Sequence, residues 1–170
     1  MDGNLTMTRL LLIILILIPS SVAAQSSNDN NYYGYLSAGG GVTAYGSGIE
    51  NNSMMIAAGG EAFVHKGLAA GAEIGMHFPP SRIGSAIGIF SPNISWHFLK
   101  RSGRVSPFIT GGYSLFFRDG TSNGFNLGGG VIWWFRDGVG LRLEARDFIP
   151  TGLGPSTRHL ISFRAGVAFR

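Results

Sequence analysis

The stretch from Gly124 to Asp147 has a two-residue period on both sides of a turn, and this period constrains the fold more than any other feature. Its second arm alternates three apolar residues with three charged ones: Leu141, Arg142, Leu143, Glu144, Ala145 and Arg146. Successive side chains of a β-strand point to opposite faces, so this arm would have one apolar and one charged face. The Arg-Asp-Gly at 136–138 is typical of a tight turn, and the stretch is therefore predicted to be a β-hairpin.

The direction in which the apolar face points separates two kinds of barrel. A soluble lipocalin-like barrel is polar outside, whereas a membrane barrel is apolar towards lipid and polar towards its lumen. Only 13% of the residues are charged, about half the ~25% usual for soluble domains. An arginine near the bilayer midplane costs about 2–4 kcal/mol on the lipid face, so Arg142 and Arg146 are predicted to face a lumen.

The N-terminus has the pattern of a secretory signal. Arg9 precedes the apolar run at 10–18, and the small residues Ala23 and Ala24 follow it. We expect a cleavable signal peptide over 1–24, a polar spacer over 25–31 and a barrel over 32–170. The apolar run is too short for a spanning helix, which disfavours a retained anchor.

Cleavage after Ala24 gives a mature protein that begins at Gln25 and fractionates with the outer membrane. N-terminal sequencing of the fractionated protein tests this. Uncleaved protein in the inner membrane would contradict the prediction.

The remaining sequence divides into eight predicted strands and no helix. They cover 32–45, 54–65, 68–78, 85–98, 105–117, the two arms of the hairpin at 124–147, and 158–169. Longer connections are predicted at 46–53, 79–84, 118–123 and 147–157, and short turns between the other strands. Aromatic residues predicted to point outward gather at the strand ends, as in the girdles of membrane barrels: Trp96, Phe98, Trp133, Phe135 and Phe169 at one end, and Phe78, Phe117 and Phe125 at the other.

Four features of the sequence resemble those of a known protein family. They are the signal, the two-residue period, a closing strand with outward aromatics, and the glycine-rich segments at 39–41, 59–60, 111–112 and 128–130. Over nearly all of its mature length the chain resembles small OmpA/OmpX-type outer-membrane β-barrel proteins of Gram-negative bacteria. That family usually ends on an aromatic residue, whereas here Arg170 follows Phe169.

The resemblance implies the fold class all-β, an eight-stranded antiparallel up-and-down transmembrane β-barrel in the outer membrane with both termini on the periplasmic side. It also implies contact with outer-membrane lipid and lipopolysaccharide, insertion by the barrel-assembly machinery, and a monomer.

Equal numbers of acids and bases fall on the predicted inner face: Glu61, Glu73, Glu144, Arg142, Arg146 and Arg164. The lumen of an eight-stranded barrel has little room beyond its side chains, so we expect these residues to pair in a salt-bridge network. The alternative is a small pore, with a proton or ion path through the same residues. Apolar side chains predicted to point inward would obstruct such a path: Tyr35, Phe63, Ile87, Ile89 and Trp134.

No catalytic, cofactor or metal site is expected. The histidines at 65, 77, 97 and 159 lack the spacing of metal ligands. The glycine triplets at 39–41 and 128–130 are not followed by a helix, as phosphate-binding loops are. His159 and Ser162 suggest a lipid A-modifying barrel enzyme, but residues three apart on a strand point to opposite faces. The cations follow no single element, which argues against nucleic-acid binding. A structural or interaction role is expected, with a lipid A-modifying enzyme or a small pore as alternatives.

Overall fold

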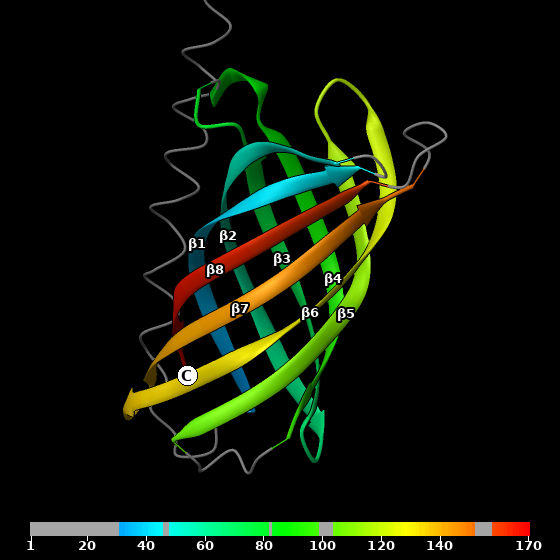
Figure 1. Cartoon of the computed structure of the whole chain (residues 1–170). Helices are drawn as coiled ribbons and strands as arrows, with labels where there is room; N and C mark the ends of the chain where they lie inside the picture. Colours follow the sequence, from blue (N-terminus) through cyan, green and yellow to red (C-terminus); the bar gives the residue numbers. More distant parts are fainter. Residues whose placement is uncertain (1–30, 46–47, 82, 99–103, 152–157) are drawn as a thin grey trace, which may run out of the picture. The chain divides into compact units, whose positions relative to one another are not determined.

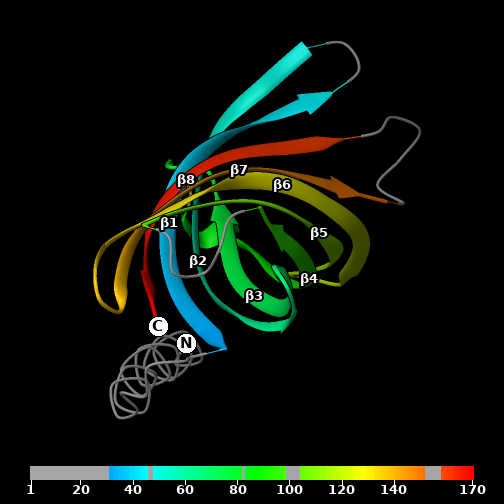
Figure 2. The same ribbon diagram turned by 90° about the horizontal axis from the view of Figure 1, so that it is seen from below.

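The computed structural model describes residues 31–45, 48–81, 83–98, 104–151 and 158–170, and the predicted signal peptide lies outside them. Eight strands form one closed antiparallel barrel in chain order, in which β1 also pairs with β8 (Figure 1). The strands are β1 (Tyr32–Tyr45), β2 (Gly48–His65), β3 (Leu68–Phe78), β4 (Ile87–His97), β5 (Val105–Phe117), β6 (Thr121–Arg136), β7 (Val139–Pro150) and β8 (His159–Phe169). This confirms the predicted fold class. Figure 2 shows the strands arranged in a ring.

The barrel is apolar outside and polar inside. On β7, Arg142 is 1% exposed, whereas the adjacent Leu143 is 45% exposed. Exposed large apolar side chains occur on all eight strands, and the buried residues include six Arg and Glu side chains. A soluble barrel would have the reverse pattern, so this surface is suited to lipid.

The two ends of the barrel differ in their connections. The end called here the terminal rim carries Asn31, Arg170 and the tight turns at 66–67 and 137–138. Gly67 and Gly138 have φ values of 94° and 84°, which favour glycine. The opposite end, called the loop rim, carries the connections after β1, β3, β5 and β7.

The strands extend further towards the loop rim than predicted. The predicted loop at 46–53 is wrong from Gly48 onward, because β2 begins there and pairs with β1; residues 46–47 lie outside the described part. Likewise β6 begins at Thr121 and β7 continues to Pro150. In 48–53 and 121–123 most residues are polar or glycine, so backbone pairing continues without the apolar alternation that marks a strand in the sequence.

The connection between β3 and β4 also differs from the prediction. A single 3-10 turn, η1 (Ile83–Ser85), lies where no helical segment was predicted, and β4 begins at Ile87 rather than at residue 85. In the described ranges no helix is long and apolar enough to cross a membrane.

Glycine allows β1 to lie close to β8. A Cβ added at Gly39 would lie 2.0 Å from the Phe163 carbonyl oxygen, whereas one at Gly40 would approach nothing closer than 3.6 Å. We therefore expect Gly39→Ala to reduce the yield of folded barrel strongly, because the backbone of β8 would have to move. Gly40→Ala is the matched control and should fold as the parent does. Refolding into detergent, followed by gel mobility without boiling, measures both.

Candidate functional site

Four strands bring the six predicted lumenal charges together. Glu61 lies on β2 and Glu73 on β3, while β7 and β8 supply the others: Arg142, Glu144, Arg146 and Arg164. All six are buried in the lumen. The two-residue period places them there, because each occupies an inward position of its strand.

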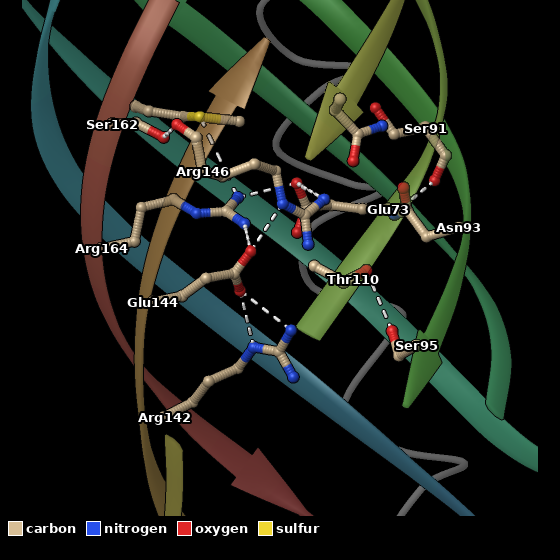
Figure 3. A network of polar contacts seen from close by, with 12 residues as sticks. Glu73, Ser91, Asn93, Ser95, Thr110, Arg142, Glu144, Arg146, Ser162 and Arg164 are labelled. Atoms are coloured by element: carbon tan, nitrogen blue, oxygen red, sulfur yellow. Dashed lines mark hydrogen bonds and ion pairs between the residues drawn. The ribbon is translucent and has the colours of Figure 1, made fainter. Parts of the chain in front are cut away.

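Glu144 is the centre of the network (Figure 3). Its carboxylate lies 2.9 Å from Arg142 Nη2, 2.5 Å from Arg146 Nε and 2.7 Å from Arg164 Nη2. One carboxylate thus accepts hydrogen bonds from three guanidinium groups. Such charge-assisted bonds offset part of the cost of burying four charges.

The other two carboxylates extend the network across the lumen. Arg164 Nη1 on β8 lies 2.7 Å from Glu73 Oε1 on β3. Arg146 Nη1 is 3.5 Å from the same oxygen, an ion-pair distance without a hydrogen bond. Glu61 Oε1 lies 3.4 Å from Arg142 Nη2. The network therefore links β2 and β3 to β7 and β8.

Three residues that the sequence analysis left out of the network belong to it. Arg142 Nη1 donates to the Tyr33 hydroxyl at 2.7 Å, and the Tyr35 hydroxyl donates to Glu73 Oε2 at 2.9 Å. His97 Nε2 lies 3.2 Å from Glu61 Oε2. Their inward positions are visible in the strand alternation, but their partners depend on how neighbouring strands are staggered.

An apolar cluster lies on each side of the charges. Towards the terminal rim are Tyr33, Tyr35, Phe108, Ile132, Trp134 and Ala168, with Phe63 packed against them. Towards the loop rim are Met55, Ala57, Ile89, Phe116 and Phe148, with Ile87 and Leu160. The Arg142 guanidinium carbon lies 4.2 Å from the Tyr35 ring centroid and 4.1 Å from that of Phe108. All five residues predicted to obstruct a path are in these clusters.

Small polar side chains line the lumen along β4, β5 and β6. The Ser91 and Ser114 hydroxyls are 2.8 Å apart, and Ser95 Oγ donates to Thr110 Oγ1 at 2.9 Å (Figure 3). Asn126 Nδ2 donates to Ser114 Oγ at 2.9 Å. These hydroxyl groups and the Asn126 amide nitrogen satisfy each other without a charged partner.

A serine, a histidine and a carboxylate lie in line near the terminal rim. His97 Nδ1 is 3.0 Å from Ser106 Oγ, and the other ring nitrogen faces Glu61. A nucleophilic serine must be reachable by its substrate. Ser106 is only 6% exposed, and the His97 ring packs against Phe63 and Phe108. Within the described residues, the Ser106 hydroxyl is therefore hardly accessible from outside the barrel.

His159 and Ser162 lie on opposite sides of the barrel wall. Ser162 is buried in the lumen and donates to the Arg146 carbonyl oxygen at 3.2 Å. The His159 ring is half-buried at the loop rim, with Nδ1 2.6 Å from Asp147 Oδ2. Within the described residues, no group of three or more His, Asp or Glu side chains is arranged to hold a metal ion.

Comparison with known proteins shows the fold. No family model matches the chain, and no curated protein matches it. Neisserial surface protein A is similar, with a TM-score of 0.63 and 16% identity over 82% of this chain and 96% of that one. The N-terminal β-barrel domain of Pseudomonas aeruginosa OprF gives a TM-score of 0.55 and 13% identity over 82% and 98%. A designed transmembrane β-barrel gives 0.53 and 12% over 85% and 98%.

These similarities extend over nearly the whole of the compared structures and over the described barrel of this chain. Together with the lipid-suited outer surface, they confirm the barrel type that the sequence predicts. The chain has the fold of the small eight-stranded outer-membrane β-barrel proteins.

Proposed function

We propose that the protein is a non-catalytic, integral outer-membrane barrel with a structural or interaction role and a lumen closed by its own side chains. The observation that supports this most is the charge network held between two apolar clusters. An ion crossing the lumen would have to displace both clusters and separate buried pairs. The outer surface and the two rims are then the parts that meet other molecules.

The terminal rim would face the periplasm and the loop rim the exterior. The barrel would be a monomer, surrounded by outer-membrane lipid and lipopolysaccharide and inserted by the barrel-assembly machinery. The two-residue turns after β2 and β6 at the terminal rim, and the longer connections after β3 and β7 at the loop rim, support this orientation, because membrane barrels have short periplasmic turns.

A closed lumen predicts that the folded protein carries no steady current. Protein reconstituted in planar bilayers should leave the baseline unchanged, while unboiled samples on a gel migrate differently from boiled ones and show that the barrel is folded. A porin reconstituted in the same way is the positive control. Regular single-channel steps from the folded protein would contradict the proposal.

One observation favours the small-pore alternative. Arg146 Nη1 and Nη2, Asn93 Oδ1 and Asn126 Oδ1 are buried without a hydrogen-bond partner. Buried polar atoms without protein partners are usually satisfied by water, so this part of the lumen would be hydrated in a conducting state. The bilayer measurement decides between the two functions.

The lipid A-modifying alternative draws on the Asp147–His159 pair at the loop rim. This pair has the acid and base of a hydrolytic site, but Ser162 is on the other side of the wall. We therefore propose that the lipid A of cells that express the protein is unchanged. Mass spectrometry of lipid A from expressing cells and from empty-vector cells tests this, and a new deacylated or acylated species would refute it.

A further inference from the structure

The two rims carry different charges. Among the described residues, the terminal rim has four cations and a single acid: Lys66, Arg104, Arg136, Arg170 and Asp137. At the loop rim, each of the two described aspartates lies beside a basic side chain. Arg118 lies 3.4 Å from Asp119, and His159 lies 2.6 Å from Asp147.

Three of the terminal-rim cations are available to an outside partner. Lys66, Arg104 and Arg136 are exposed, and none makes a side-chain hydrogen bond or ion pair with another described residue. Arg170 differs, because its guanidinium carbon lies 4.3 Å from the Trp134 ring centroid. Unpaired cations at one rim give this end of the barrel a positive potential.

Exposed aromatic side chains lie directly beside these cations on the outer surface of β4 and β6. Trp96 is 43% exposed, and Trp133 is 52% exposed. Phe98 and Phe135 are also exposed. Indole rings in such positions lie at the headgroup level of a bilayer.

The strand register joins the cations and the aromatics into one surface. The Arg104 carbonyl oxygen accepts a hydrogen bond from Trp134 N at 2.7 Å, and Val105 pairs with Trp133. The β2–β3 turn lies next to β4, because His97 N donates to the Gly67 carbonyl oxygen at 2.8 Å. Lys66 is therefore beside the end of β4 that carries Trp96.

We propose that Lys66, Arg104, Arg136, Trp96 and Trp133 form a binding surface for anionic phospholipids, called here the cationic girdle. The indoles would fix the depth of the rim at the headgroups, and the cations would then reach the phosphates. Each lysine or arginine close to an anionic membrane surface raises the binding constant for that surface roughly fivefold. The inference rests on the proposal that the barrel is inserted in a membrane. It does not depend on which rim faces the periplasm or on whether the protein is an enzyme.

Lipid suits this surface better than a soluble acidic ligand does. A soluble ligand would neutralise the cations, but it would leave the exposed rings of Trp96, Phe98, Trp133 and Phe135 in water. An anionic phospholipid supplies acyl chains for the rings and a phosphate for the cations. Both parts of the surface are then satisfied by one molecule.

The tryptophans report directly on the lipids around this rim. The chain has only three, Trp96, Trp133 and Trp134, and Trp134 is 7% exposed towards the lumen. Bromine on acyl chains quenches indole fluorescence on contact. We would fold the protein into vesicles of phosphatidylcholine with a minor fraction of phosphatidylglycerol, and brominate either the acidic lipid or an equal amount of the neutral lipid.

Enrichment of acidic lipid predicts stronger quenching by brominated phosphatidylglycerol than by brominated phosphatidylcholine, with a difference that shrinks as salt rises. The double variant Arg104→Gln/Arg136→Gln should lose most of this preference. The double variant Arg118→Gln/Arg158→Gln removes two cations from the other rim and should keep it. Vesicles have the same lipids in both leaflets, so orientation does not affect the result.

Equal quenching by the two brominated lipids would overturn the proposal, and so would a preference that Arg104→Gln/Arg136→Gln leaves unchanged. Failure of the proposed membrane barrel itself looks different, because neither lipid would then quench and the gel mobility would not depend on boiling. The gel also shows whether each variant is folded before its quenching is compared.

Discussion

Replacing Glu144 with Gln is expected to lower the free energy of unfolding by about 3–5 kcal/mol, the usual cost of breaking a fully buried ion pair. Glu144 accepts from Arg142, Arg146 and Arg164 at 2.5–2.9 Å. A neutral amide keeps the shape of the carboxylate but leaves three buried guanidinium groups facing two carboxylates. Urea titration of the barrel folded in lipid vesicles measures the change.

Two further variants test whether the destabilisation comes from the loss of the buried ion pairs or would follow the loss of any carboxylate. Asp119→Asn removes an exposed partner of Arg118, and exposed pairs contribute about 0–1 kcal/mol, so its midpoint should hardly move. Glu144→Gln/Arg164→Met removes one cation together with the anion and should recover part of the loss. If Glu144→Gln unfolded at the same urea concentration as the parent, the network would not contribute to stability.

The direction of each side chain was predictable because a strand has a fixed period. In 141–146 the alternation of apolar and charged residues predicted the faces that the structure shows for Arg142 and Leu143. The turn at 136–138 was also predictable, since Gly138 has the positive φ that the Arg-Asp-Gly sequence favours. These are local properties of the chain.

The partners of the lumenal residues could not be predicted from the sequence. Arg164 and Glu73 are 91 residues apart and meet across the lumen, which depends on the stagger of all eight strands. The strand pattern predicts only that His97 faces inward, whereas the structure shows that its ring lies between Glu61 and Ser106. Strand alternation gives the face of such a residue and says nothing of its partner.

The strand ends at the loop rim were missed for a different reason. Gly48–Ser53 on β2 contains glycine and asparagine, which are typical of loops, but its backbone pairs with β1. Hydrophobic alternation marks a strand only where one face meets lipid. Outside the apolar band the signal disappears although the strand continues.

Leu143→Arg is expected to destabilise the inserted barrel by about 2–4 kcal/mol, because it places a cation in hydrocarbon. Leu143 is five residues from the turn at Gly138, which at a rise of ~3.3 Å and a tilt of ~40° is about 13 Å along the barrel axis. An apolar band of about 25 Å therefore has its midplane near this residue. Leu143→Phe keeps an apolar surface and is the control. Its free energy of unfolding, measured by urea titration, should equal that of the parent.

The adjacent Arg142 gives the complementary result, since it points the other way. Arg142→Leu removes the partner of Tyr33, Glu61 and Glu144, so it should also destabilise the barrel, although it makes the residue more apolar.

Folding titrations into vesicles of increasing acyl-chain length distinguish the two causes. Leu143→Arg should fold worse as the bilayer thickens, because its guanidinium then lies further from water. The loss from Arg142→Leu should not depend on thickness, because its cause lies within the lumen. If the stability of both variants changed with bilayer thickness in the same way, the assignment of Leu143 to the lipid face and of Arg142 to the lumen would have to be abandoned.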